Sequence, residues 1–237
     1  DIHATGSGGV SAVAVTKAKA LPIRAVSDWN EIRERKLDLY ALRRTAATRA
    51  EARRFYGMEA TAVQTEAALE WLQSRQDVRR GCFGPLSGDA DRDLATQSLA
   101  LLALLAEGGG TSTADLRRLE SIKLGLGWLR STLGERRGDF SATDHRSSGL
   151  AALALVEGAG ILGDADLRLA AERALANLDG GLPTQPGPSG LGGFTLLALE
   201  SAHESGLRVP KRALQQAQEI GRALPTATDD AGRIGLA

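Results

Sequence analysis

Three alternating carboxylates form the first candidate for chemistry in this chain of 237 residues. Such a group could bind a hard cation or, if it is desolvated, supply a general acid. The three are Asp89, Asp91 and Asp93. A calcium loop is disfavoured, because Leu94 and Ala100 stand where that loop needs glycine and glutamate. The plainer expectation is that Asp93 caps a helix that begins at Leu94.

Cys82 and His145 are the candidate centre of a zinc site, which needs about three protein ligands. They occupy comparable loop positions in two similar segments, and Asp144 or Asp139 could complete a set with them. The alternative for Cys82, the single cysteine, is a small buried apolar residue. We expect no metal centre and no cofactor, and a single cysteine also excludes an internal disulfide.

His145 is also a weak catalytic candidate, because Asp144, His145 and Ser147 are the residue types of a hydrolytic triad. A triad is a spatial arrangement, however, and residues this close in sequence cannot all point at one another. We expect His145 to cap a helix or to form a hydrogen bond in the core, with a pocket-lining role as the alternative. Nucleotide binding has no support, since the glycines at 108–110 are typical of a helix terminator and follow no predicted strand.

Two arginine pairs recur in equivalent loops, Arg79–Arg80 and Arg136–Arg137. We expect them on the same rim of the fold, where they could bind an acidic partner, and simple solvation of the loops is the alternative. Further arginines crowd an earlier segment and alternate there with acids, which predicts a solvated, ion-paired face. They are Arg33, Arg35, Arg43, Arg44, Arg49, Arg53 and Arg54.

The composition excludes several classes of protein. Twenty-nine basic residues balance 29 acidic ones, so the global electrostatic footprint of a nucleic-acid or anionic-membrane binder is missing, and a local basic face is the alternative that stays open. No apolar run approaches the roughly 18 residues of a membrane span. Because 43% of residues are hydrophobic but only 4% aromatic, we expect a core of Leu, Ala, Val and Ile, built from helices. The start at Asp1 suggests a processed or partial chain, with an extracytoplasmic location slightly favoured.

The elements that position these residues form a repeat. Segments 67–83 and 124–140 align so that Trp71 matches Trp128 and Phe83 matches Phe140. An apolar stretch follows each segment, and a third one begins near Phe194. Neither an amphipathic nor an apolar helix can bury its surface alone, so the units must stack. We predict an all-α solenoid or toroid of about four helical pairs, with the apolar helices inside.

Glycines and caps divide these helices from one another. Gly158 with Gly160, and Gly206, stand where helices should end, and Asp164 and Pro210 stand where they should begin. The predicted regions are an extended arm or linker (1–27), a peripheral charged helix (28–59) and an α/α repeat domain (60–237).

The first repeat resembles the signature of the squalene cyclase and protein prenyltransferase repeat family. The matching residues in order are Ala68, Trp71–Leu72, Gln76 and Gly81–Phe83, whereas the second copy has Leu133 in place of the glutamine. The pattern is also similar to toroid-repeat proteins of planctomycete-type bacteria, most of which lack an assigned activity. The resemblance implies an α/α toroid whose glutamine and aromatic residues fix a loop to the neighbouring helix. The residues then expected to serve packing are Trp71, Gln76, Phe83, Trp128 and Phe140.

Enzymes of that family carry an acidic cluster that ends in two adjacent aspartates, or a zinc held by Asp, Cys and His. Here Arg92 follows Asp91, and the zinc ligands are incomplete. We therefore expect a non-catalytic interaction or assembly (scaffold) protein that binds other protein subunits or copies of itself, and no nucleic acid. The alternative is an isoprenoid or other apolar-chain binding protein or enzyme that uses the toroid cavity, with one of the three aspartates as acid. Its weakness is that the inner helices offer only Phe194 to stabilise a carbocation.

Overall fold

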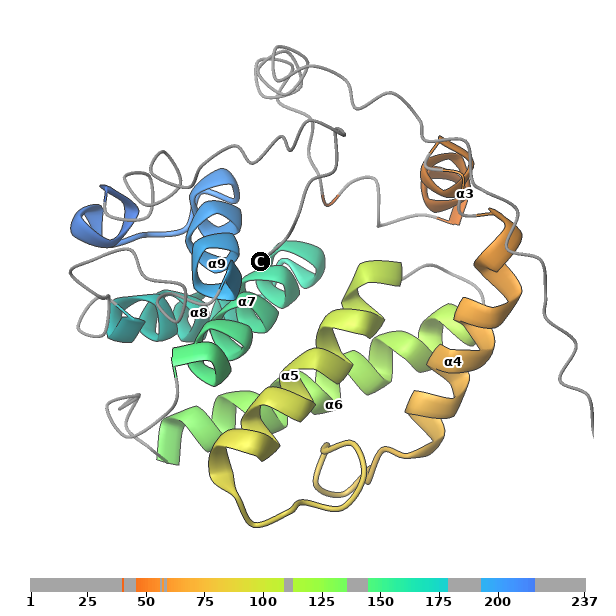
Figure 1. Cartoon of the computed structure of the whole chain (residues 1–237), viewed down its shortest axis with the longest axis horizontal. Coiled ribbons are helices and arrows are strands. Elements are labelled where there is room, and N and C mark those ends of the chain that lie inside the picture. Colours follow the sequence, from red (N-terminus) through yellow and green to blue (C-terminus); the bar gives the residue numbers. More distant parts are fainter. Residues whose placement is uncertain are drawn as a thin grey trace, which may run out of the picture. The chain divides into compact units, whose positions relative to one another are not determined.

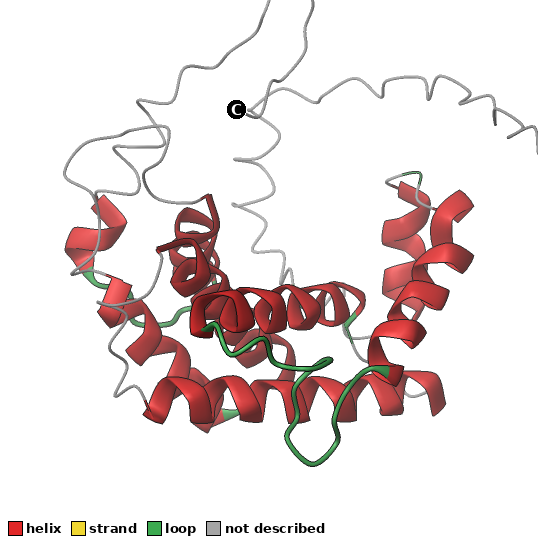
Figure 2. Ribbon diagram, turned by 60° about the horizontal axis from the view of Figure 1, so that its bottom comes forward, coloured by secondary structure: helices red, strands yellow, loops and turns green. Residues whose placement is uncertain are grey.

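The computed structural model describes residues 40, 46–55, 57, 59–108, 113–135, 145–178 and 193–215. Contacts divide the chain into two units, Asp1–Leu37 and Asp38–Ala237, and all described residues belong to the second. These residues form helices and loops without a strand, apart from one isolated bridge between Gln76 and Phe83 (Figure 2). The expected all-α class is therefore confirmed for this part of the chain, whereas the predicted arm at 1–27 lies outside it.

The helices of the described segments are shown in Figure 1. They are α3 (Ala46–Phe55), the 3₁₀ turn η1 (Glu59–Thr61), α4 (Ala62–Ser74), α5 (Ala90–Glu107), α6 (Thr113–Glu135), α7 (His145–Leu162), α8 (Ala165–Leu178) and α9 (Gly193–Glu204). Another helical turn begins at Lys211, directly after Pro210, as predicted.

Helix α7 is the centre of the packing. It lies between α5 and α9 and contacts both along their lengths, and α8 and α6 also pack against it (Figure 1). The core is made of aliphatic side chains from all of these helices, as the composition predicts. Its largest fully buried members are Leu94, Leu101, Leu104, Leu105, Ile122, Leu126, Leu129, Leu150, Leu155, Val156, Leu175 and Leu199.

Two glycines that we expected to end α7 lie inside it. The helix continues to Leu162 and ends at Gly163, whose φ is +65°. Gly158 instead allows close packing, since a Cβ there would lie 2.6 Å from Cδ1 of Leu126 in α6. Gly160 likewise makes room for the Tyr40 ring. The prediction failed because a glycine needed for helix contact and a glycine needed for a turn look the same in sequence.

Other predicted helix boundaries are confirmed. The Asp164 carboxylate accepts hydrogen bonds from the backbone N–H groups of Asp166 and Leu167, at 2.8 and 3.0 Å, and so caps α8. Gly108 and Gly206 follow the ends of α5 and α9 with positive φ. These signals succeed because each satisfies backbone groups that a helix end leaves without partners.

Tyr40 attaches the start of the second unit to the helical core. Its ring covers Gly160 of α7, and its hydroxyl forms hydrogen bonds with Oγ of Ser201 (3.1 Å) and Oγ of Ser205 (2.8 Å) at the end of α9. Ser201 in turn donates to Oε1 of Glu157 at 2.6 Å. The tyrosine thus bridges α7 and α9.

Candidate interaction surface

The three aspartates lie at the start of α5. Asp89 is the N-cap, because its carboxylate accepts from the N–H groups of Asp91 (3.0 Å) and Arg92 (3.2 Å). The helix therefore begins at Ala90, and the expectation that Asp93 caps a helix from Leu94 is wrong. Asp89, four residues earlier, accepts hydrogen bonds from backbone N–H groups of the first helical turn. The Asp93 side chain can therefore accept hydrogen bonds from the loop that precedes the helix.

Asp93 closes the loop in front of α5. Its carboxylate accepts from the backbone N–H of Ser87 (2.7 Å), the Ser87 hydroxyl (2.7 Å) and the N–H of Gly88 (3.1 Å). Desolvation acts to raise the pKa of Asp93, but these hydrogen bonds and the charge of Arg92 together lower it below its ordinary value. Asp93 therefore connects the loop to the first turn of α5 through an ionised carboxylate.

Only some of the candidate metal ligands belong to the described residues. Cys82 is almost fully buried in the loop before α5, the environment of a small apolar residue. In the described segments, no group of three His, Cys, Asp or Glu residues could hold a metal ion. His145 is the first residue of α7, whereas Asp139 and Asp144 lie outside those segments.

Trp71 is the largest departure from the packing expectation. Its side chain is 60% exposed on α4, although we expected it in the core. Trp128, its match in the predicted repeat alignment, is half-buried and packs against the core, beside the loop at Gly81. The difference arises because α4 buries only Leu69, whereas α6 packs between its neighbours.

Exposed arginines and another apolar side chain lie close to this tryptophan in the sequence. The Arg75 guanidinium lies over the Trp71 ring, 5.3 Å from its centroid, as a cation–π contact. Val78 is 70% exposed in the turn that follows, and the predicted rim residues Arg79 and Arg80 come directly after it, both exposed. We call these five residues the Trp71 surface. Arg136 and Arg137 lie outside the described residues, so a rim shared by both arginine pairs remains a prediction.

The turn after α4 carries the residues of the Trp71 surface other than Trp71 itself, and it is fixed by its own backbone. Asp77 N–H donates to the carbonyl of Cys82 (2.8 Å), Gly81 N–H to that of Asp77 (2.6 Å), and Gly84 N–H to that of Arg75 (2.8 Å). The Asp77 carboxylate also accepts from the N–H groups of Arg79 and Arg80. The backbone of the turn is therefore fixed on both sides of Val78, and the arginine side chains are exposed.

Gln76 connects this turn to α6, as the family resemblance implies for the glutamine. Its Nε2 donates to the carbonyl oxygens of Gly81 (3.0 Å) and Ser121 (2.9 Å). Gly81 itself lies so close to α6 that an added Cβ would overlap the carbonyl of Leu124, and its φ of +79° also favours glycine. The turn is thus seated against α6 by a hydrogen bond and by close contact.

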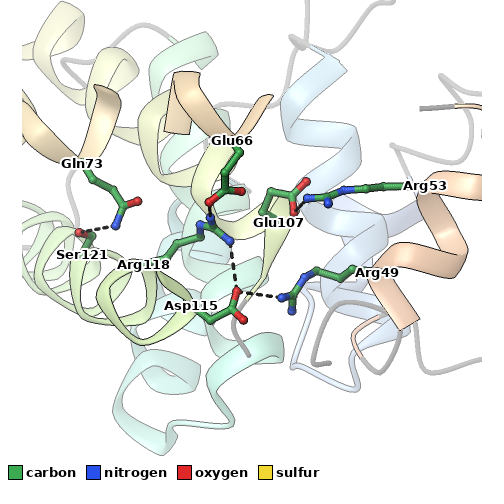
Figure 3. Close-up of polar contacts among 8 residues, drawn as sticks. All are labelled: Arg49, Arg53, Glu66, Gln73, Glu107, Asp115, Arg118 and Ser121. Carbon is green, nitrogen blue, oxygen red and sulfur yellow. Dashed lines mark hydrogen bonds and ion pairs between the residues drawn. The ribbon is translucent and has the colours of Figure 1, made fainter. Parts of the chain in front are cut away.

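Buried charges hold α3 and α4 against α6 (Figure 3). Arg118 of α6, only 2% exposed, pairs with Glu66 of α4 and with Asp115 (3.4 Å). Asp115 also accepts from Nη2 of Arg49 in α3 at 2.8 Å. The expected solvated face is therefore wrong for Arg49, which is buried. Alternating charges in sequence do not reveal that a carboxylate on a distant helix will neutralise one of them.

The Trp71 surface retains positive charge. Within the described part of the chain, the guanidinium groups of Arg75, Arg79 and Arg80 form no ion pair. The nearest acid in sequence, Asp77, uses its carboxylate to hold the backbone of the turn. Three cations without an ion pair among the described residues, one of them over an exposed indole, make this a surface that a neutralising partner would stabilise.

None of the described helices combines the length and the apolar character needed to cross a bilayer. Comparison of the chain with protein-family models, with curated proteins and with solved structures finds no match. What the chain does must therefore be inferred from its own residues.

Proposed function

We propose that the chain is a non-catalytic interaction or assembly protein built from squalene cyclase and prenyltransferase-like helical repeats. The packing is compatible with such repeats: α4 precedes α5, α6 precedes α7 and α8 precedes α9, and the second helices of these pairs meet at α7. In this interpretation α5, α7 and α9 are the inner helices of an α/α toroid or arc. Its partners are other protein subunits or copies of itself.

The observation that carries this proposal is the exposure of Trp71 on a fixed support. Tryptophan and arginine are the residues most enriched among interface positions that contribute strongly to binding. A surface that is already ordered loses little conformational entropy when it binds. Gln76 and the backbone bonds of the turn supply that order here. Solvation of the neighbouring loop does not account for an exposed indole on α4.

The alternative, a protein that binds isoprenoid or other apolar chains, has one observation in its favour. Leu99 of α5 and Leu197 of α9 are about half exposed, on helices that the toroid interpretation places around a cavity. Apolar side chains exposed there could contact an apolar ligand.

Light scattering combined with native mass spectrometry distinguishes the two functions. We expect the purified chain to form a stable assembly with itself or with other protein subunits. A monomer that carries a bound lipid would replace this proposal by the alternative. A monomer with neither partner nor ligand, at every concentration tested, would contradict both.

A further inference from the structure

We propose that the Trp71 surface binds an acidic segment of a partner protein that also carries an apolar side chain. The carboxylates would lie beside Arg75, Arg79 and Arg80, and the apolar side chain against Trp71 and Val78. This inference rests on the proposed function and specifies its contact surface and the chemistry of its partner.

Charge is the first argument for an acidic segment. The three guanidinium groups form no ion pair in the described chain, and arginine is suited to bidentate recognition of carboxylates. Two acids, Glu70 and Asp77, are close in sequence and keep their charge, but they are fewer than the three arginines and form no ion pair with them among the described residues. An excess of positive charge remains for a partner to neutralise.

Exposed apolar area is the second argument. Trp71 and Val78 are more than half exposed. A partner side chain that covers them would remove apolar surface from water, and the loss of water would also strengthen the charged contacts of Arg75 beside the indole. The Arg75 guanidinium already occupies a position over the ring, so it is oriented before the partner arrives. A segment with carboxylates alone would leave the apolar area uncovered.

The surrounding charge favours a protein segment over a nucleic acid. The whole chain has a formal net charge of zero, so it lacks the wide positive field that draws a polyphosphate. A short acidic segment can place its carboxylates only where the arginines lie.

The test uses the whole chain and a fluorescein-labelled peptide of Glu, Asp and Leu, followed by fluorescence anisotropy. We expect saturable binding that weakens as salt is added. Replacing the acids of the peptide by Gln and Asn, or its leucines by serine, should abolish or strongly reduce binding. The two peptide controls separate the charged contribution from the apolar one.

Variants of the chain locate the site. R79E/R80E and W71A should each weaken peptide binding by about tenfold or more, the size expected for interface anchors. R79Q/R80Q provides a milder second variant, and circular dichroism checks that each protein is folded. Matched controls are R173E/R212E, which reverses two exposed arginines elsewhere, and L169A, which truncates an exposed leucine of α8. Both should bind as the wild type does.

Three results would overturn the inference: no peptide binding, equal losses in the control variants, or equally tight binding of single-stranded oligodeoxythymidine or phosphatidylserine vesicles through the same arginines. The proposed function stands or falls separately. If the chain assembles but substitutions in the Trp71 surface change neither its assembly nor its binding of the peptide, the inference is wrong and the proposed function is retained. A chain that never assembles contradicts the function itself.

Discussion

Gln97 holds both backbone polar groups of Phe83. Its Oε1 accepts from the Phe83 N–H at 2.6 Å, and its Nε2 donates to the Phe83 carbonyl at 2.9 Å. Both residues are buried, so a side-chain amide from α5 replaces the water that the loop backbone has lost. Together with Gln76, which faces α6, it fixes the loop that supports the Trp71 surface.

Replacing Gln97 by leucine should destabilise the fold. Leucine keeps the volume but leaves a buried N–H and a buried carbonyl without partners, which predicts a loss of about 2 kcal/mol or more in the free energy of unfolding. Chemical denaturation measures it. Gln64→Leu, at an exposed position of α4, is the matched control and should change stability by less than about 0.5 kcal/mol. Equal effects of the two substitutions would contradict this role of Gln97.

Substitutions at Gly81 and Gly84 should distinguish the effect of a positive φ on stability from the effect of a close contact. Both have positive φ, but a Cβ at Gly84 meets nothing within 4 Å, whereas one at Gly81 overlaps the Leu124 carbonyl. Gly84→Ala should therefore lower the free energy of unfolding by about 1 kcal/mol, from conformation alone. Gly81→Ala should lower it by at least about 2 kcal/mol, because the loop must also move away from α6. Thermal denaturation of both variants checks the difference, and equal losses would show that the contact with α6 is loose.

The sequence predicted local features of this fold better than its exposed surface. The helix boundaries at Asp164 and Gly206 follow from residue types at positions that are visible in the chain, whereas the contact of Gln76 with a neighbouring helix was expected only from the family resemblance. The burial of Arg49 and the exposure of Trp71 depend on which helix covers them. That information belongs to tertiary packing, and a repeat alignment that pairs Trp71 with Trp128 gives both residues the same environment.

Asp115 stabilises two buried arginines at once, Arg49 and Arg118. Asp115→Asn should lower the free energy of unfolding by about 3 kcal/mol, since it removes the carboxylate that two buried guanidinium groups share, although Arg118 keeps its contact with Glu66. Asp166→Asn is the control: its carboxylate is 82% exposed and lies 3.6 Å from Arg130. That change should have an effect below about 1 kcal/mol. Urea titrations measure the free energy of unfolding of both variants. A mild effect of Asp115→Asn would show that water reaches the arginines.

Trp71 and Trp128 should respond differently to truncation. Trp71→Ala removes an exposed side chain and should change the free energy of unfolding by only about 0.5 kcal/mol. Trp128→Ala removes packing against the core and should lower it by about 2 kcal/mol or more. Denaturant unfolding followed by circular dichroism avoids dependence on the tryptophan signal itself. A large loss for Trp71→Ala would mean that another segment covers the indole, and it would remove the basis for the Trp71 surface.

Glu172 of α8 should make stability depend on pH. Its pKa lies below the ordinary value of 4.5, mainly because it accepts a hydrogen bond from the Arg208 N–H (3.1 Å), and the charges of Arg208 and Arg168 add to this. A pKa lowered by folding contributes stability that is complete above the unfolded value and is lost as pH falls through the folded one. The free energy of unfolding should therefore decrease progressively below about pH 4.5, and Asp93 acts in the same direction.

Glu172→Gln should remove part of this acid sensitivity. The amide cannot gain a proton in that range, so the variant should be less stable than the wild type at neutral pH and should approach it as the pH falls below the folded pKa. Glu120→Gln, at an exposed position of α6, reports the effect of losing one carboxylate elsewhere. Denaturant titrations at a series of pH values compare the three proteins. Parallel curves for Glu172→Gln and the wild type would show that the contact with Arg208 does not persist in solution.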